Sequence, residues 1–310
     1  MPVKSVPAPS SPPTLDVPAV SAHAHSRAAD FLALTKPRLN FLVVVTALAA
    51  YVLGADAAAP LLVMVNTVIG TALVAGGASA LNQVWEQQTD ALMRRTRMRP
   101  LPDRRLLSRE AMWFGTALCL VGLVVLWFGT NPLATAVAGL TAASYVLCYT
   151  PLKTRTSLST IVGAVPGALP AVIGWTAATE TWSIEAWVLF GIVFMWQMPH
   201  FLAIAWMYRD DYARAGIPLL PVLEPDGGST GRQAVLYTAA LIPISFLPTL
   251  VGLAGARFLS GAIVLDLVLL WLAIEFGATR TMPSARRLFA GTILYLPLLW
   301  TVLLADHFAR

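Results

Sequence analysis

The sequence predicts an all-α membrane protein, a bundle of nine transmembrane helices with a cytoplasmic N-terminus. Of its 310 residues, 57% are hydrophobic and only 12% are charged, whereas soluble domains carry about 25% charged residues. A helix needs roughly 20 apolar residues to cross a bilayer, and nine runs meet this need: 39–58, 61–81, 111–130, 132–150, 158–178, 184–207, 233–254, 258–277 and 288–305. Every Lys and Arg except Arg257 and Arg310 then lies on one side. Because cytoplasmic connectors carry the excess of basic residues, this distribution supports both the count and the orientation.

The rest of the composition excludes several classes of protein. The formal charge of +5 suggests a nucleic-acid binder, but the basic residues lie in short connectors between apolar runs. Residues 1–30 are rich in Pro, Ala and Ser and lack the apolar core of a signal peptide, so we expect a disordered cytoplasmic tail. Cys119 and Cys148 lie in apolar runs without a CxxC pattern, which indicates buried core residues rather than a disulfide or zinc site. Residues 31–310 then form a single integral-membrane domain.

Two spans contain helix breakers. The fifth contains Pro166 and Pro170, which are tolerated where a helix kinks or lines a cavity. Pro199 and His200 interrupt the sixth span, so its regularity is the least certain feature of the nine.

The long connectors indicate where the functional site lies. Those between the second and third spans (about 82–110) and between the sixth and seventh (about 208–232) hold most of the ionisable residues. Both are on the predicted cytoplasmic side. We therefore expect function at that face.

An amide and two carboxylates form a stripe in the first of these connectors. In a helix, Asn82, Glu86 and Asp90 recur every four residues, drifting about 40° per step over about 12 Å. One interpretation is a helix end with a solvated acidic face. Polar groups near membrane depth, however, usually face an internal cavity, and Mg²⁺ binds through one or two carboxylates together with substrate phosphates. The stripe therefore indicates a magnesium site.

Four arginines follow the stripe directly: Arg94, Arg95, Arg97 and Arg99. In any cytoplasmic loop such a cluster can be a topology signal that faces anionic lipids. Guanidinium groups also match phosphate oxygens, and both roles can coexist. With the acids, the cluster indicates a place where a metal and a phosphate-rich group meet.

Two further groups lie on the same predicted face. Tyr149 and Lys153 are four residues apart at the end of the fourth span, although Pro151 suggests that the helix ends there. An interfacial Tyr with a topogenic Lys is the alternative. His200 is the one histidine inside a predicted span, where a packing role competes with a binding role. The acidic pair in the later connector, Asp210 and Asp211, has a solvated turn as its alternative.

Together these motifs resemble the UbiA family of intramembrane prenyltransferases over residues 32–305. The stripe is similar to the family's first acidic motif, RTRMRPLP at 95–102 to its RTxxRPLP extension, and the Tyr149–Lys153 pair to its YxxxK element. Within the family, LTKPR at 34–38, the Glu at 86 and the WQMPHFLAIA and DYARAGIPLLP runs resemble the branch that prenylates haem. Tyr208 and Tyr212 stand where many members carry a second DxxxD motif, so that Asp210 and Asp211 between them are the acids left for a second magnesium.

The resemblance implies a UbiA-like bundle and a reaction. Farnesyl diphosphate would bind with its diphosphate on Mg²⁺ and its tail inside the bundle. The 2-vinyl group of haem B, a substrate rather than a cofactor, would accept the farnesyl group to give haem O. A haem A synthase would be a candidate partner, and the bacterial inner membrane the expected location.

The resemblance also implies residue roles. The catalytic group comprises Asn82, Glu86, Asp90, Tyr149 and Lys153, and Mg²⁺ is assigned to Glu86 and Asp90. Diphosphate contacts are assigned to Arg94, Arg95, Arg99, Lys153 and Arg155, with Asp210 and Asp211 assisting, also as further metal ligands. Haem contacts are assigned to His200, Lys36, Arg38, Tyr208 and Tyr212.

Two other functions stay open. A different UbiA-type enzyme, prenylating an aromatic acid or a quinone precursor, would share the first motif but should carry DxxxD at Tyr208 and Tyr212. A transporter would be expected to place charges at mid-membrane or to show repeated halves with broken helices. The tyrosines at 208 and 212 and the Pro199-His200-Phe201 run argue against the first, and the clustering of ionisable residues at one face argues against the second.

Overall fold

The computed structural model describes residues 26–55 and 60–310, which fold into helices and connecting turns without a β-strand. Within these ranges nine helical segments are long and apolar enough to cross a membrane, and they bear out the expected all-α bundle. They are α2 (Pro37–Gly54), α3 (Leu61–Leu92), α4 (Ser108–Gly129), the composite of α5 (Pro132–Ala143), η1 (Ser144–Tyr149) and α6 (Thr150–Leu152), α7 (Ser159–Thr179), α8 (Ile184–Met207), α11 (Gly228–Leu250), α12 (Ala256–Thr279) and α13 (Met282–Phe308). Three short helices complete the description: α1 (Arg27–Leu34), α9 (Arg209–Arg214) and α10 (Leu220–Leu223).

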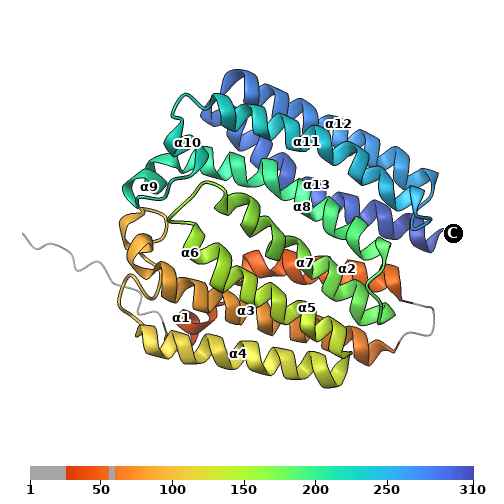
Figure 1. Ribbon diagram of the computed structural model, residues 1–310, viewed down its shortest axis with the longest axis horizontal. Helices are drawn as coiled ribbons and strands as arrows, with labels where there is room; N and C mark the ends of the chain where they lie inside the picture. The colour runs from red at the N-terminus through yellow and green to blue at the C-terminus, as the bar shows by residue number, and fades with distance from the viewer. Residues whose placement is uncertain (1–25, 56–59) are drawn as a thin grey trace, which may run out of the picture.

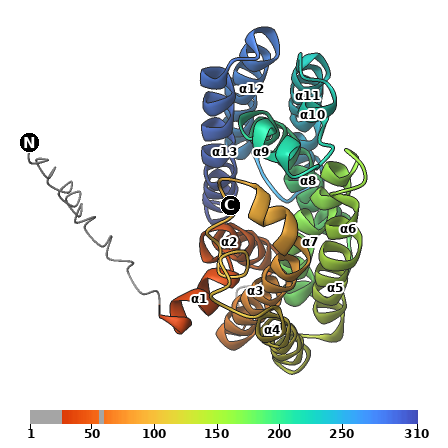
Figure 2. The same ribbon diagram turned by 90° about the vertical axis from the view of Figure 1, so that its left-hand side faces the viewer.

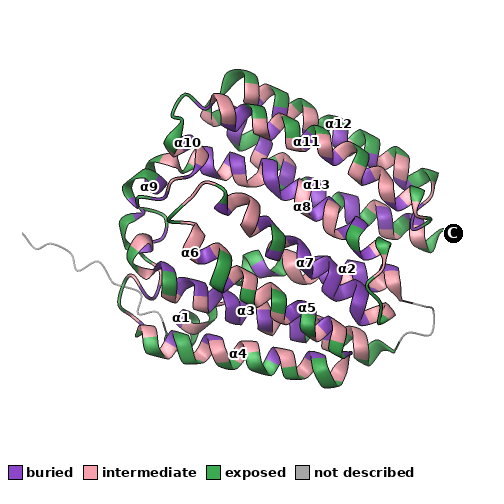
Figure 3. Cartoon of the chain, viewed as in Figure 1, coloured by how far each residue is buried: buried purple, intermediate pink, exposed green. Residues whose placement is uncertain are grey.

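The long helices run side by side, with α7 and α8 at the centre (Figure 1). Of the apolar window of each span, 67% is buried in α7 and 61% in α8, against 28% in α4 and α12. Figure 3 shows the same contrast, because buried residues dominate α7 and α8 while α4 and α12 expose much of their surface. Large apolar side chains such as Phe128 and Trp271 are exposed. In a bilayer these outer faces meet lipid, which costs nothing there.

Small residues let neighbouring helices approach closely. A Cβ at Gly174 of α7 would collide with the Ala47 carbonyl of α2, and a Cβ at Gly77 of α3 would lie 2.5 Å from the Gly115 carbonyl of α4. Membrane helices associate through such van der Waals contact because lipid gives them little hydrophobic reason to pair. These contacts fix α2 and α4 against the helices that carry the candidate site.

Two helices extend beyond their expected spans, and a third keeps its expected bounds without the expected interruption. The second continues past residue 81 to Leu92, so the whole acidic stripe lies on α3. The sixth runs unbroken through Pro199 and His200 as α8, since Pro is tolerated where neighbouring helices satisfy the freed backbone groups. The fourth does not end at Pro151, because the Lys153 N–H still bonds the Tyr149 carbonyl at 3.0 Å. Its turn from Ser144 to Tyr149 is π-helical.

The tail expected over 1–30 falls mainly outside the described residues. Its last residues belong to α1, which begins at Arg27. The Ser26 side chain accepts a hydrogen bond from the Ala29 N–H at 3.2 Å and caps this helix. Asp30, buried in α1, pairs with Arg105 at 3.0 Å and ties the helix to the loop after α3. The last four residues of the expected tail, 27–30, are therefore helical.

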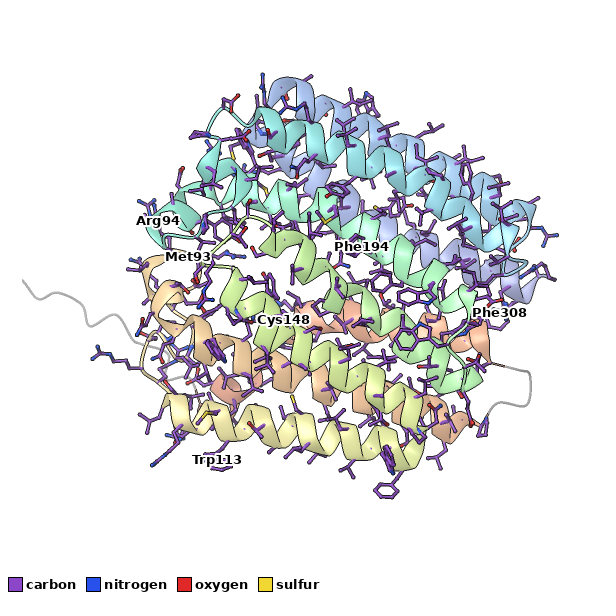
Figure 4. The ribbon with its side chains drawn as sticks, viewed as in Figure 1. Met93, Arg94, Trp113, Cys148, Phe194 and Phe308 are labelled. Carbon is purple, nitrogen blue, oxygen red and sulfur yellow. The ribbon has the colours of Figure 1, made fainter. Side chains whose placement is uncertain are left out.

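Two further expectations were wrong. Asp266 lies in the middle of α12 and is buried, so the ionisable residues do not all gather at one face. The Tyr295 hydroxyl of α13 donates to its Oδ1 at 2.6 Å and the Ser245 hydroxyl of α11 lies 2.5 Å from its Oδ2. Cross-helix hydrogen bonds thus satisfy this carboxyl inside the membrane. Cys148 is exposed rather than buried, because it faces outward from the composite helix (Figure 4).

Candidate functional site

The motif residues meet at one end of the bundle. Figure 4 places Met93 and Arg94 at this end and Phe308 at the opposite end. Figure 2 looks onto it and shows the segment after α3 together with α9 lying across the ends of the long helices. The end of α3, the end of α6 and the start of α2 reach the same region.

Each member of the acidic stripe receives one cation from a different part of the chain. Asn82, Glu86 and Asp90 are all buried on one face of α3. Lys36 donates to Asn82 Oδ1 at 2.8 Å, Lys153 to Glu86 Oε1 at 2.8 Å and Arg99 to Asp90 Oδ2 at 2.6 Å. The four-residue spacing thus stacks three polar pairs along one helix, as expected of a stripe that faces the protein.

Two of these cations have shifted pKa values. Burial lowers the pKa of Lys36 to about 8, and the nearby Arg99 charge lowers it further. Burial also acts to lower the pKa of Lys153, but the neighbouring Tyr149 and Glu86 oxygens outweigh it, and the net shift is upward. Lys153 therefore stays charged at neutral pH, whereas Lys36 loses its proton near pH 8.

Asp90 keeps one oxygen free for a further ligand. Its Oδ1 is buried and has no hydrogen-bond partner among the described residues, an arrangement that costs free energy unless something binds there. The described chain contains no group of three or more His, Cys, Asp and Glu side chains that could hold a metal by itself. Mg²⁺ does not need such a cage, because it keeps several waters and takes one or two carboxylates plus phosphates. Glu86 and Asp90 fit that donor set.

An aromatic wall stands next to the stripe. The π-helical turn brings the rings of Tyr145 and Tyr149 into a stack with centroids 5.4 Å apart. The Thr150 hydroxyl bonds the Tyr145 carbonyl at 2.8 Å and lies 3.1 Å from Asn82 Nδ2, which links the turn to α3. On the other side, a Cβ at Gly163 of α7 would lie 2.6 Å from the Tyr149 ring. Only a glycine leaves room for this ring.

A largely apolar cavity of about 320 Å³ extends from this wall into the bundle. Tyr145, Tyr149 and Lys153 line it on one side, and Trp196 and His200 of α8 line it elsewhere. Pro166 and Pro170 of α7 also line it, which agrees with the expectation that breakers in the fifth span accompany a cavity. The charged stripe and the apolar cavity therefore adjoin at Tyr149 and Lys153.

The second acidic pair does not join the stripe. Asp211 is buried and accepts hydrogen bonds from the backbone N–H groups of Arg94 at 3.3 Å and Arg95 at 3.4 Å, and it also pairs with Arg214. The Asp210 side chain is 84% exposed. Asp211 therefore anchors the loop after α3, and neither carboxylate lies with the proposed metal ligands.

The remaining arginines divide into two groups. Arg95 donates to the Tyr212 hydroxyl at 3.4 Å and lies over the Tyr208 ring, 4.7 Å from its centroid. Tyr212 is buried and lines the cavity, so this contact brings Arg95 to its rim. Arg94 and Arg155 are exposed, as Arg95 is, and Arg155 lines a small pocket with Glu86 and Lys153.

The residues expected to contact haem lie in different places. Lys36 joins the stripe through Asn82, and Arg38 is exposed at the start of α2. Tyr208 and Tyr212 flank Arg95, as described above. His200 lines the cavity, and its Nδ1 lies 2.9 Å from the Thr292 hydroxyl of α13. Of these five residues, His200 and Tyr212 line the cavity.

Sequence reasoning missed Tyr145, Thr150 and Gly163. Tyr145, Tyr149 and Lys153 share the four-residue spacing of the stripe, and that repeat could have pointed to Tyr145. The roles of Thr150 and Gly163 depend on the π-helical turn and on the packing of α7, for which the sequence carries no signal.

Known proteins resemble this chain over most of its length. The sequence pattern of the UbiA prenyltransferase family matches residues 43–302. A protoheme IX farnesyltransferase from Solibacter usitatus is 46% identical over 287 residues, 90% of this chain and 98% of that protein. A structure concerning digeranylgeranylglyceryl phosphate synthase matches with a TM-score of 0.76 at 14% identity, covering 91% of this chain and 98% of that one. A UbiA homolog from Archaeoglobus fulgidus bound to GPP and Mg²⁺ matches with a TM-score of 0.60 at 14% identity, covering 88% and 99%.

Proposed function

The chain belongs to the UbiA prenyltransferase family, and we propose that it transfers the farnesyl group of farnesyl diphosphate to the 2-vinyl group of haem B. The allylic C–O bond breaks and diphosphate leaves, while a C–C bond forms to the terminal vinyl carbon. Water then adds to the resulting cation and loses a proton, which gives haem O. The observation that carries the proposal is the stack of three polar pairs, each with one cation, at the side of an apolar cavity. The extensive identity to a protoheme IX farnesyltransferase supports the choice of haem as acceptor.

The diphosphate end of the substrate is assigned to the charged stack. Lys153 and Arg99 would exchange part of their carboxylate contact for phosphate oxygens, while Lys36, bonded to Asn82, and Arg95, bonded to Tyr212 at the cavity rim, would add charge. Glu86 and Asp90 would hold Mg²⁺, which supplies neutralisation of the charge that develops on the leaving diphosphate. The unpaired Asp90 Oδ1 supports this assignment. Fixed positive groups of this kind stabilise a leaving anion without reorganising at the moment of reaction.

The apolar end is assigned to the cavity. As diphosphate leaves, positive charge develops on the allylic carbon, and the stacked Tyr145 and Tyr149 rings offer their faces to a cation. The apolar lining keeps water from capturing this cation before the vinyl group does. The acceptor would meet the farnesyl group in the same cavity, near His200.

The orientation and location follow from the distribution of charge. Because all basic residues except Arg257 and Arg310 lie on one side, the stripe would face the cytoplasm of a bacterial inner membrane. The product carries a long apolar chain and stays in the bilayer. A haem A synthase in the same membrane is its proposed recipient.

A direct assay tests the proposal. Membranes that contain the protein are incubated with haem B, farnesyl diphosphate and Mg²⁺, and the haems are extracted and identified by mass spectrometry. We expect a product heavier than haem B by one farnesyl group and one hydroxyl, lost when EDTA is added or farnesyl diphosphate is omitted. An aromatic acid replaces haem B in a parallel reaction. Prenylation of that acid, without any new haem, would overturn the choice of acceptor.

A further inference from the structure

The side-chain amide of Gln197 on α8 is held between two helices in one orientation. Its Nε2 donates to the Ala164 carbonyl of α7 at 3.3 Å and to the Val193 carbonyl of α8 at 3.1 Å. A side-chain amide has two donor protons, and these two carbonyls take both of them. The reverse orientation would set the amide oxygen against two carbonyl oxygens, so the hydrogen bonds identify Oε1 as the free end.

The amide oxygen is left as an acceptor at the apolar cavity. Gln197 lines this cavity although only 4% of the residue is exposed. Oε1 receives no hydrogen bond from the residues that the structure describes, and an unpaired buried acceptor costs free energy unless a donor binds it. Gly167 of α7 lies against the amide, and a Cβ there would collide with Oε1. The glycine therefore leaves room for the oxygen in this position.

The residue before Gly167 supplies a second acceptor. Pro170 has no N–H, so the Pro166 carbonyl lacks the donor that it would have in a regular helix. Both prolines line the cavity. A buried water makes two to four hydrogen bonds and has two protons to donate. Two neighbouring acceptors in an otherwise apolar lining therefore suit a single held water.

The amide lies one helical turn from the aromatic wall. A Cβ at Gly163 would meet the Tyr149 ring, and one at Gly167 would meet the Gln197 amide. Four residues of an α-helix advance the chain by about 6 Å. Farnesyl diphosphate would lose its diphosphate beside the Tyr149 ring, and the haem carbon that then becomes cationic lies two bonds beyond the allylic carbon. A water on Gln197 is thus placed to reach the haem carbon rather than the allylic one.

We infer that Gln197 Oε1 holds the water that becomes the hydroxyl group of the product, an inference that rests on the proposed function. Once the farnesyl carbon has bonded to the terminal vinyl carbon, positive charge lies on the vinyl carbon next to the macrocycle. The water oxygen bonds to this carbon, and the proton that it loses passes to the released diphosphate. Because Oε1 accepts one water proton, a lone pair of the water is turned toward the cation. Without a held water, the cation instead loses a proton from the neighbouring carbon and a double bond forms.

The test compares two products of one reaction. Membranes that contain each variant are incubated with haem B, farnesyl diphosphate and Mg²⁺ in water enriched in ¹⁸O, and the haems are identified by mass spectrometry. We expect the wild type to form a farnesylated haem with one labelled hydroxyl. In Gln197→Leu, the ratio of the farnesylated haem that lacks this water to the hydroxylated haem should rise roughly tenfold or more, the scale of one lost hydrogen bond. Gln197→Glu keeps an oxygen at this position and should recover most of the hydroxylated product. Gln233→Leu on α11, outside the cavity lining, is the matched control and should match the wild type.

The outcomes separate the inference from the function on which it rests. An unchanged product ratio in Gln197→Leu overturns the inference and leaves the proposed function in place. So does an equal fall in both products, which would assign Gln197 to the packing of α7 against α8. Gly167→Ala keeps the amide but displaces its oxygen, and it should raise the same ratio if Gln197→Leu fails to fold. A wild type that forms no farnesylated haem contradicts the proposed function itself, and the inference with it.

Discussion

Lys153 Nζ lies 2.8 Å from Glu86 Oε1 and joins the end of α6 to α3. The two residues are far apart in the sequence, and Lys153 also lines the apolar cavity. Their contact brings the charged stack and the aromatic wall together. Lys153 and Arg99 are thus paired with Glu86 and Asp90, and a diphosphate bound here would replace some of these contacts.

Removing either stripe carboxylate should abolish most activity. For Glu86→Gln and Asp90→Asn we expect turnover to fall by roughly 100-fold or more, the usual scale for removing a group that stabilises transition-state charge. Raising the Mg²⁺ concentration should recover little of it, because the ligand itself is missing. Asp226→Asn, at an exposed position, is the matched control. Near-normal haem O formation by a well-expressed Glu86→Gln protein would rule out the metal assignment.

The lowered pKa of Lys36 should make diphosphate binding depend on pH. Below about pH 8 Lys36 is protonated and attracts the anion, whereas above it the amine is increasingly neutral. Since a bound anion favours the protonated amine, ligand and proton binding reinforce each other. We therefore expect the affinity for inorganic diphosphate, measured by calorimetry, to fall as pH rises from 8 to 9.5. Lys36→Arg keeps its charge over this range, so an equally steep fall in that variant would contradict the assignment.

Gly163 should be intolerant of a methyl group. A Cβ there meets the Tyr149 ring at 2.6 Å, so Gly163→Ala must displace the ring from its stack with Tyr145. We expect a lower kcat with little change in the amount of folded protein. Gly139→Ala is the control, because its Cβ would find its nearest neighbour at 3.8 Å, an ordinary contact. Equal kcat values for the two variants would show that the position of the Tyr149 ring does not affect catalysis.

The two adjacent acids of α9 should differ sharply. Asp211→Ala removes the acceptor of the Arg94 and Arg95 backbone N–H groups, so the loop 93–106 should exchange amide hydrogens faster and the KM for farnesyl diphosphate should rise. Asp210→Ala removes a side chain that is 84% exposed and should leave loop protection unchanged. Hydrogen exchange read by mass spectrometry compares them. The reverse order of effects would mean that Asp210, rather than Asp211, organises this loop.

The buried hydroxyl of Tyr295 should contribute to stability more than to chemistry. Tyr295→Phe leaves Asp266 Oδ1 without its donor, and an unsatisfied buried group costs about 1–3 kcal/mol. We expect a lower unfolding temperature in detergent but a near-normal kcat at low temperature. Tyr237→Phe is the control, since that hydroxyl has no partner in the described chain. An unchanged unfolding temperature for Tyr295→Phe would show that this hydrogen bond contributes little.

The sequence was most informative where one physical rule acts along one helix. The spans followed from apolar length, and the stripe of Asn82, Glu86 and Asp90 followed from a four-residue spacing that α3 preserves to its end. It was least informative where partners come from elsewhere. Asp211 binds backbone N–H groups, which leave no trace in a residue pattern. Asp266 is tolerated at mid-membrane because two other helices supply hydrogen-bond donors. The sequence of α12 does not predict these donors.

Because the turn Ser144–Tyr149 is π-helical, the number of residues in this turn helps to set the geometry of the site. A π turn contains one residue more than an α turn, and each residue of an α-helix rotates the chain by about 100°. Deleting Leu147 from the turn would therefore change the register of Tyr145 against Tyr149 and Lys153 without removing any of these three side chains. Among relatives, a gap at this point in an alignment would be as informative as a substitution of Lys153 itself.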